Sequence, residues 1–98
     1  MATYQILYWH DIPIQVRSGR RRNRVSMELP QRFQVAIDNA AMASNLTGTD
    51  AYLEAFMWSE PMERKGSGEE VVQQVVAELN AAFPKIDWQK TAKSISKL

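Results

Sequence analysis

Three stretches near the start of the chain alternate side chains with a period of two, and this pattern constrains the fold more than any other feature of the sequence. They cover residues 3–9, 12–16 and 25–29. Successive side chains of a strand point to opposite faces of a sheet, so the alternation indicates strands. His10-Asp11 lies between the first two stretches, and a polar segment containing Gly19 separates the last two. We therefore expect residues 12–16 to form a second strand or a bent continuation of the first, and residues 25–29 to complete a β-hairpin.

Helical spacing begins at Pro30, because proline suits the first helical position and apolar residues recur behind it every three or four positions. This predicts a helix over residues 30–44. Ser67 and Glu70 have the spacing of a capping box and predict a second helix that ends before Pro84. Asp87 predicts the start of a short third helix with one apolar and one lysine-bearing side.

Residues 51–62 do not fit one type of structure. Alternation of Leu53, Ala55 and Met57 with their neighbours favours a strand over residues 53–62, whereas residues 51–58 also fit a helix. We favour the strand here. The order of strands in the sheet depends on this choice.

The order strand, strand, strand, helix, strand, helix, helix predicts an α+β fold of two layers. We expect a mainly antiparallel sheet of three or four strands with two helices on one face and a short C-terminal helix. The chain has 98 residues, which is enough for one core. Residues 1–84 are expected to form a single α+β domain, and residues 85–98 a short amphipathic helix or tail.

The composition is that of a folded soluble protein, with 45% hydrophobic and 23% charged residues. The chain begins without the basic region and cleavage site of a secretory signal, and no apolar run is long enough to span a membrane. We therefore expect a cytoplasmic protein without a membrane partner.

Positive charge is concentrated in one segment. Five of the seven arginines are Arg17, Arg20, Arg21, Arg22 and Arg24, which lie around the expected hairpin turn. The rest of the chain is acidic on balance. A planar guanidinium matches carboxylates and phosphates, so this segment predicts docking on an acidic protein surface or, less favoured, on nucleic acid or a phosphate ligand. A solvated hairpin tip that prevents strand pairing is the third interpretation.

The aromatic residues extend this hypothesis. Trp9 and Trp58 lie in expected strands and are predicted to join the arginines in a partner-binding surface if they are exposed. The alternative is that these aromatics are core residues on neighbouring strands. Trp58 precedes Ser59-Glu60-Pro61 and is the one expected to be exposed.

Little in the chain points to catalysis. The chain has no cysteine and one histidine, so we expect no disulfide, no metal site and no cofactor. His10-Asp11 is the only histidine–carboxylate pair, and no nucleophile is identifiable beside it. We expect a turn there, with Asp11 capping backbone groups before Pro13, and no catalytic residue.

Four groups of short strings carry a resemblance that spans residues 3–83: YQILYWHDIP at 4–13, LPQRF at 29–33 with AID at 36–38, GTDAYLE at 48–54 with Trp58, and EEV at 69–71 with EL at 78–79. Together they resemble a small bacterial domain family described as virulence factor, the domain type also found in conserved virulence factor C. The resemblance implies a bacterial cytoplasmic accessory subunit or regulatory module that works beside other proteins, and it transfers no catalytic or binding residue. Relatives joined to Nfu-like segments imply iron–sulfur carriage, but without cysteine this chain is limited to scaffolding or assistance in transfer.

The sequence as a whole predicts a non-enzymatic interaction module that docks through its basic hairpin loop. The expected partner is another protein with an acidic surface. A homodimer through an exposed strand edge is a further possibility.

Overall fold

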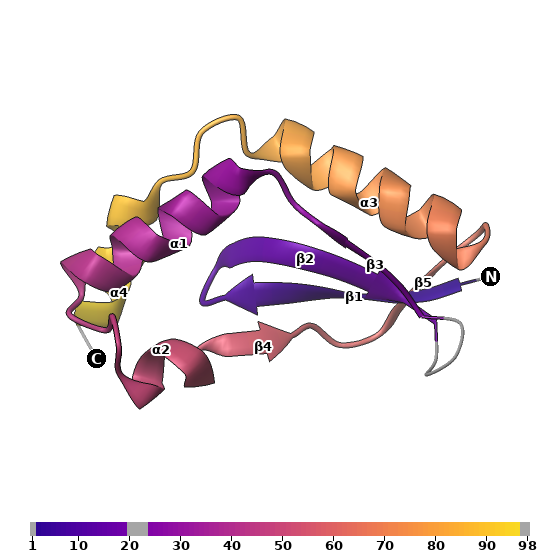
Figure 1. Ribbon diagram of the computed structural model, residues 1–98. Helices are drawn as coiled ribbons and strands as arrows, with labels where there is room; N and C mark the ends of the chain where they lie inside the picture. Colours follow the sequence, from indigo (N-terminus) through magenta and orange to yellow (C-terminus); the bar gives the residue numbers. More distant parts are fainter. Residues whose placement is uncertain (1, 20–23, 97–98) are drawn as a thin grey trace.

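The computed structural model of the protein describes residues 2–19 and 24–96 and confirms the α+β class. An antiparallel sheet carries its main helices on one side (Figure 1). The elements are β1 (Ala2–Trp9), β2 (Ile12–Ser18), β3 (Val25–Glu28), α1 (Gln31–Ala43), α2 (Asp50–Glu54), β4 (Phe56–Trp58), β5 (Met62–Arg64), α3 (Gly68–Ala82) and α4 (Trp88–Ser96).

The sheet is built around β1, the longest strand. β2 pairs with one edge of β1, and β3 continues the sheet beyond β2. On the other edge, β4 pairs with the end of β1 at residues 7–9 and β5 with its start at residues 2–4. The sheet therefore has five strands, because the chain after α2 contributes two short strands to the same edge.

Residues 53–62 differ from the single strand expected there. Leu53 lies in the helix α2. Only residues 56–58 form β4, and a separate strand, β5, begins at Met62. The Thr49 hydroxyl accepts a hydrogen bond from the backbone N–H of Tyr52, which caps the short helix. The expected strand was therefore too long, and a helix over the whole of 51–58 is also wrong, since each pattern covers only part of the segment.

Two groups of buried side chains hold the layers together. Ile6 and Val16 of the sheet pack against the valines of α3. Trp9 and Ile12 pack against α1, whose Phe33 is fully buried. Truncating a buried side chain of this size to alanine costs about 3–5 kcal/mol, so these contacts decide whether the domain folds.

The expected helix ends are confirmed. The Ser67 hydroxyl accepts a hydrogen bond from the backbone N–H of Glu70 at 3.2 Å, and the Asp87 carboxylate accepts one from that of Lys90 at 3.1 Å. At the other end of α3, Arg32 donates to the carbonyls of Asn80 and Phe83, which have no partner within the helix. Local side-chain hydrogen bonds thus set the starts of α3 and α4, and a side chain of α1 satisfies the end of α3.

The C-terminal helix α4 lies beside α1 (Figure 1). Ala92 is buried in the α1 core, and Trp88 and Ile95 pack around it. A membrane-spanning helix was not found among the described residues: none is both long and apolar enough.

Candidate docking site at the basic end of the sheet

The β2–β3 hairpin expected from the sequence is confirmed, with antiparallel pairing from Gln15 opposite Glu28 to Ser18 opposite Val25. Arg17 belongs to β2 and is half-buried, whereas Arg24 directly precedes β3 and is exposed. Arg20, Arg21 and Arg22, which the sequence places in the docking loop, lie outside the described residues. The described part of the loop is its base, formed by the end of β2, Gly19 and Arg24.

The base of the loop is anchored to the rest of the domain. Ser18 is buried, and its hydroxyl donates a hydrogen bond to the Thr3 carbonyl at 2.7 Å. Gly68, at the start of α3, approaches so closely that an added Cβ would lie 3.2 Å from the Ser18 hydroxyl oxygen. The first turn of α3 and β1 together hold the end of β2 in place.

The guanidinium of Arg17 is fixed on two sides. Its Nε and Nη2 donate hydrogen bonds to Oε1 of Gln5 at 3.1 and 3.0 Å. Its Cζ lies 3.8 Å from the ring centroid of Trp58, a cation–π contact. We call Gln5, Arg17 and Trp58 the Arg17 cluster.

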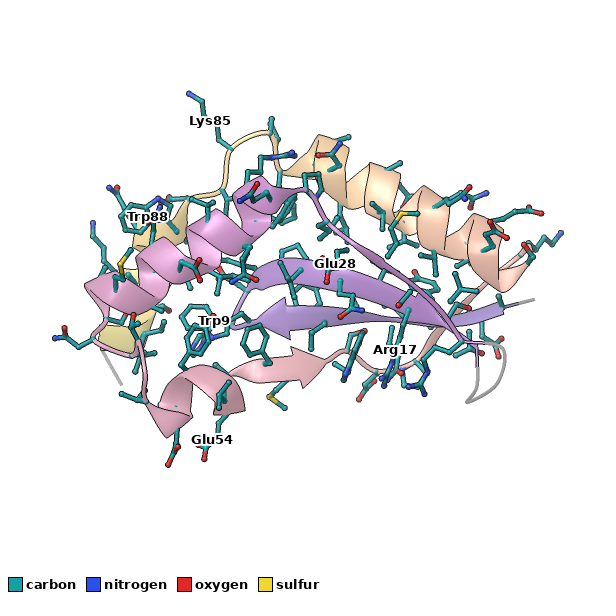
Figure 2. The ribbon with its side chains drawn as sticks, in the orientation of Figure 1. Trp9, Arg17, Glu28, Glu54, Lys85 and Trp88 are labelled. Carbon is teal, nitrogen blue, oxygen red and sulfur yellow. The ribbon has the colours of Figure 1, made fainter. Side chains whose placement is uncertain are left out.

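Sheet register explains why these three side chains meet. Gln5 lies opposite Arg17 on β1 and β2, and Leu7 lies opposite Trp58 on β1 and β4. Partners directly across an antiparallel pair project from the same face, and Gln5 and Leu7 are two residues apart. Val16, the neighbour of Arg17, points to α3, so the Arg17 cluster lies on the opposite face of the sheet, where Figure 2 shows Arg17.

Ser59, the residue directly after β4, ties the end of that strand to β1. Its carbonyl accepts a hydrogen bond from Nε2 of Gln5 at 3.0 Å, and its hydroxyl accepts one from the backbone N–H of Ile6 at 2.9 Å. Gln5 is therefore held by Ser59 while it holds Arg17. Sequence reasoning missed Gln5 and Ser59, although the alternation that places Gln5 beside Leu7 on one face was a usable signal.

The charges at this end of the sheet repel one another. Burial lowers the pKa of Arg17, and the neighbouring charge of Arg24 lowers it further. Within residues 2–19 and 24–96, the one ion pair joins Arg64 to Glu78, at 2.5 Å. Neither Arg17 nor Arg24 is thus neutralised by a carboxylate in the described part of the chain.

Trp9 does not share this surface. Its side chain is 0% exposed, and its indole N–H donates a hydrogen bond to the Tyr52 carbonyl at 2.9 Å. Figure 2 shows it in the interior beneath α1. The prediction that Trp9 contributes to a partner-binding surface is therefore corrected: the hydrophobic effect and the hydrogen bond place it in the core, the alternative that the sequence also allowed.

His10 and Asp11 form the turn between β1 and β2, as expected. The Asp11 carboxylate, however, accepts a hydrogen bond from the Thr91 hydroxyl at 2.5 Å instead of capping the backbone. His10, Asp11, Thr91 and Ser94 line a hollow of about 340 Å³. The hydrogen bond from Thr91 to Asp11 attaches α4 to the turn between β1 and β2.

Comparison with protein families shows that residues 7–90 match a family model described as "Virulence factor". The chain belongs to the virulence factor domain family. This agrees with the resemblance seen over residues 3–83 and extends it into α4. Searches of the curated proteins and of the solved structures found no match.

Proposed function

We propose that this virulence factor domain is a non-enzymatic accessory module of the cytoplasm that docks on an acidic partner protein through the basic end of its β2–β3 hairpin. The observation that carries the proposal is the pair Arg17 and Arg24, two neighbouring guanidiniums without a carboxylate among the described residues. A carboxylate from a partner would remove their mutual repulsion.

The Arg17 cluster supports specific rather than diffuse attraction. Gln5 and Trp58 hold the Arg17 guanidinium in one orientation, so little side-chain entropy is lost when a ligand binds. Its Nη1 has no hydrogen-bond acceptor in the part of the chain that the structure describes. One edge of a fixed guanidinium is thus available to a carboxylate.

The test compares three forms of the protein as baits in extracts, with bound proteins identified by mass spectrometry. The first is the wild type, and the second carries Arg20→Ser, Arg21→Ser and Arg22→Ser. The matched control carries Lys85→Ser, Lys90→Ser and Lys93→Ser, which removes the same charge from the opposite end of the chain. We expect the arginine variant to lose a protein that the wild type and the lysine variant both capture, and to lose it more completely as salt is raised.

The outcomes separate the alternatives. Equal capture by the two variants and the wild type would refute docking through the loop. Loss of the captured protein after nuclease treatment would replace the proposal with binding of nucleic acid.

Nucleic acid is the second candidate because Trp58 is half-buried on the open face of the sheet beside Arg17. Aromatic rings next to arginines can stack on bases of single strands. A titration with a single-stranded oligonucleotide at two salt concentrations tests this candidate, which requires Trp58 fluorescence to be quenched and the affinity to fall steeply with salt.

A further inference from the structure

A second surface feature has the opposite charge from the hairpin. Asp38, Ala41 and Met42 of α1, Thr47 and Gly48 of the connection, and Tyr52 of α2 line an open hollow of about 440 Å³. The carboxylate of Asp38 is the only charged group in this lining. α2, which contributes Tyr52 to this lining, lies at the end of the molecule away from the paired ends of β2 and β3 (Figure 1).

The chain around the hollow is acidic. Residues 33–63 contain Asp38, Asp50, Glu54, Glu60 and Glu63 and neither lysine nor arginine. Figure 2 shows Glu54 on α2 directed away from the body of the protein. A cation near this segment is therefore attracted before it makes any contact.

Asp38 retains binding capacity. Its Oδ1 accepts a hydrogen bond from Nε2 of Gln34 at 2.9 Å and lies 3.5 Å from the Tyr52 hydroxyl. No described residue donates to its Oδ2. The carboxylate thus has an oxygen available to a ligand and no cationic partner within the described residues.

Tyr52 provides a rigid aromatic wall. Its ring lies 5.8 Å from that of Trp9 and 5.5 Å, edge-on, from that of Phe56. Its carbonyl also accepts the hydrogen bond from the buried Trp9 indole. An aromatic ring beside a carboxylate favours a cation, through its negative face as well as through the ion pair.

We propose that this hollow binds an alkyl guanidinium or ammonium group. The cationic group pairs with the Asp38 carboxylate and lies against the Tyr52 ring, and the methylene stem lies along Ala41 and Met42. Met42 is 58% exposed, and an aliphatic stem would cover part of it. The group belongs to a free small molecule, since a hollow of about 440 Å³ has room for one, and an arginine side chain of a second copy is the alternative outcome of the test. The proposal does not rest on docking through the hairpin, because none of its residues belongs to that site.

The test is a titration of the full chain, followed by the amide signals of residues 38, 47, 48 and 52 in nitrogen-15 NMR spectra. The probes are N-acetyl-arginine amide and, as the uncharged control of the same shape, N-acetyl-citrulline amide. We expect saturable shifts with the arginine probe alone, at a dissociation constant on the order of 1 mM. No saturable shift, or equal binding of both probes, would overturn the proposal.

Two matched pairs of variants locate the site. Asp38→Asn should weaken binding about tenfold, whereas Asp50→Asn, an acid outside the hollow, should change it less than about twofold. Met42→Arg should abolish binding, since residues 38 and 42 are one helical turn apart and the new guanidinium would pair with Asp38. Ala43→Arg adds the same charge at an exposed position of α1 that is five residues from Asp38, on another side of the helix, and should weaken binding only slightly. Equal losses within either pair would show diffuse attraction instead of a site.

Sedimentation of the concentrated protein identifies the source of the cation. If the wild type self-associates, and the association is lost both in Asp38→Asn and in the variant with Arg20, Arg21 and Arg22 replaced by serine, the cation comes from a second copy of the chain. A wild type that remains monomeric while it binds the arginine probe identifies a free ligand. The capture experiment proposed above is unaffected by Asp38→Asn, so failure of one proposal is distinguishable from failure of the other.

Discussion

At the scale of single residues, similar side chains have different structural roles. Arg17 is held by Gln5 and Trp58, whereas Arg24 is exposed and Arg32 caps α3. Trp9 is fully buried, yet Trp58 lies on the open face of the sheet. Residue type predicted which side chains can bind an anion or stack, but position in the sheet decided which of them remain available.

His10 has a backbone conformation that is unusual for a histidine. It has a φ of 55°, in the left-handed region, within the two-residue turn between β1 and β2. Its ring packs edge-on against Trp9 with centroids 4.6 Å apart. Asparagine tolerates this conformation, whereas a β-branched side chain does not.

We predict that His10→Val lowers the free energy of unfolding by about 1–2 kcal/mol more than His10→Asn does. Both variants lose the contact with Trp9, so their difference isolates the backbone conformation. Urea denaturation followed by tryptophan fluorescence measures both values. Equal stabilities would mean that the turn changes its conformation at no cost.

At the scale of elements, α3 depends on a single side chain at its start and on one apolar face. α3 begins where the Ser67 hydroxyl accepts from the N–H of Glu70, and it buries Val71, Val72 and Val75 against the sheet. The same turn holds the end of β2 through Gly68 and Ser18. A change at the start of α3 therefore also affects the base of the docking loop.

We predict that Ser67→Ala destabilises the protein by about 1 kcal/mol, because one backbone N–H loses its acceptor. Ser67→Asp is the control, since its carboxylate caps the helix equally well and suits the helix dipole. Thermal unfolding by circular dichroism compares the two. A Ser67→Asp variant as unstable as Ser67→Ala would show that the hydroxyl acts through another contact.

At the scale of the whole molecule, α4 joins the same core as α1. Thr91 and Ala92 are buried, and Thr91 donates to Asp11, which lies 80 positions earlier in the sequence. The C-terminal segment was expected to be a helix or tail outside a domain of residues 1–84. Its contacts with α1 lead us to expect that it contributes to the stability of that domain.

We predict that Ile95→Ser lowers the free energy of unfolding by about 1–2 kcal/mol, since Ile95 packs against the α1 core. Lys93→Ser, on the exposed side of α4, should change it by less than about 0.5 kcal/mol. Chemical denaturation measures both. If Ile95→Ser changed the free energy of unfolding as little as Lys93→Ser does, α4 would be detached in solution, and residues 1–84 would be the stable unit.

Much of the fold was predictable because its signals are local. Alternation identified β1, β2 and β3, and the Ser67 and Asp87 caps identified the starts of α3 and α4. Residues 53–62 were not predicted correctly, because a short capped helix and a three-residue strand follow each other within one apolar stretch. The three-residue strand β4 takes its conformation from its pairing with β1, which the local sequence does not reveal.

The docking hypothesis likewise rests partly on the sequence and partly on the tertiary structure. The concentration of arginines and the family membership were visible in the chain, since charge and sequence motifs do not depend on packing. The contact of Arg17 with Trp58 and Gln5, the burial of Trp9 and the hollow beside Asp38 all required the three-dimensional structure. The register of β1 with β2 and β4 brings Arg17, Gln5 and Trp58 together, the packing of α1 on the sheet buries Trp9, and α1 with α2 and the connection between them forms the hollow.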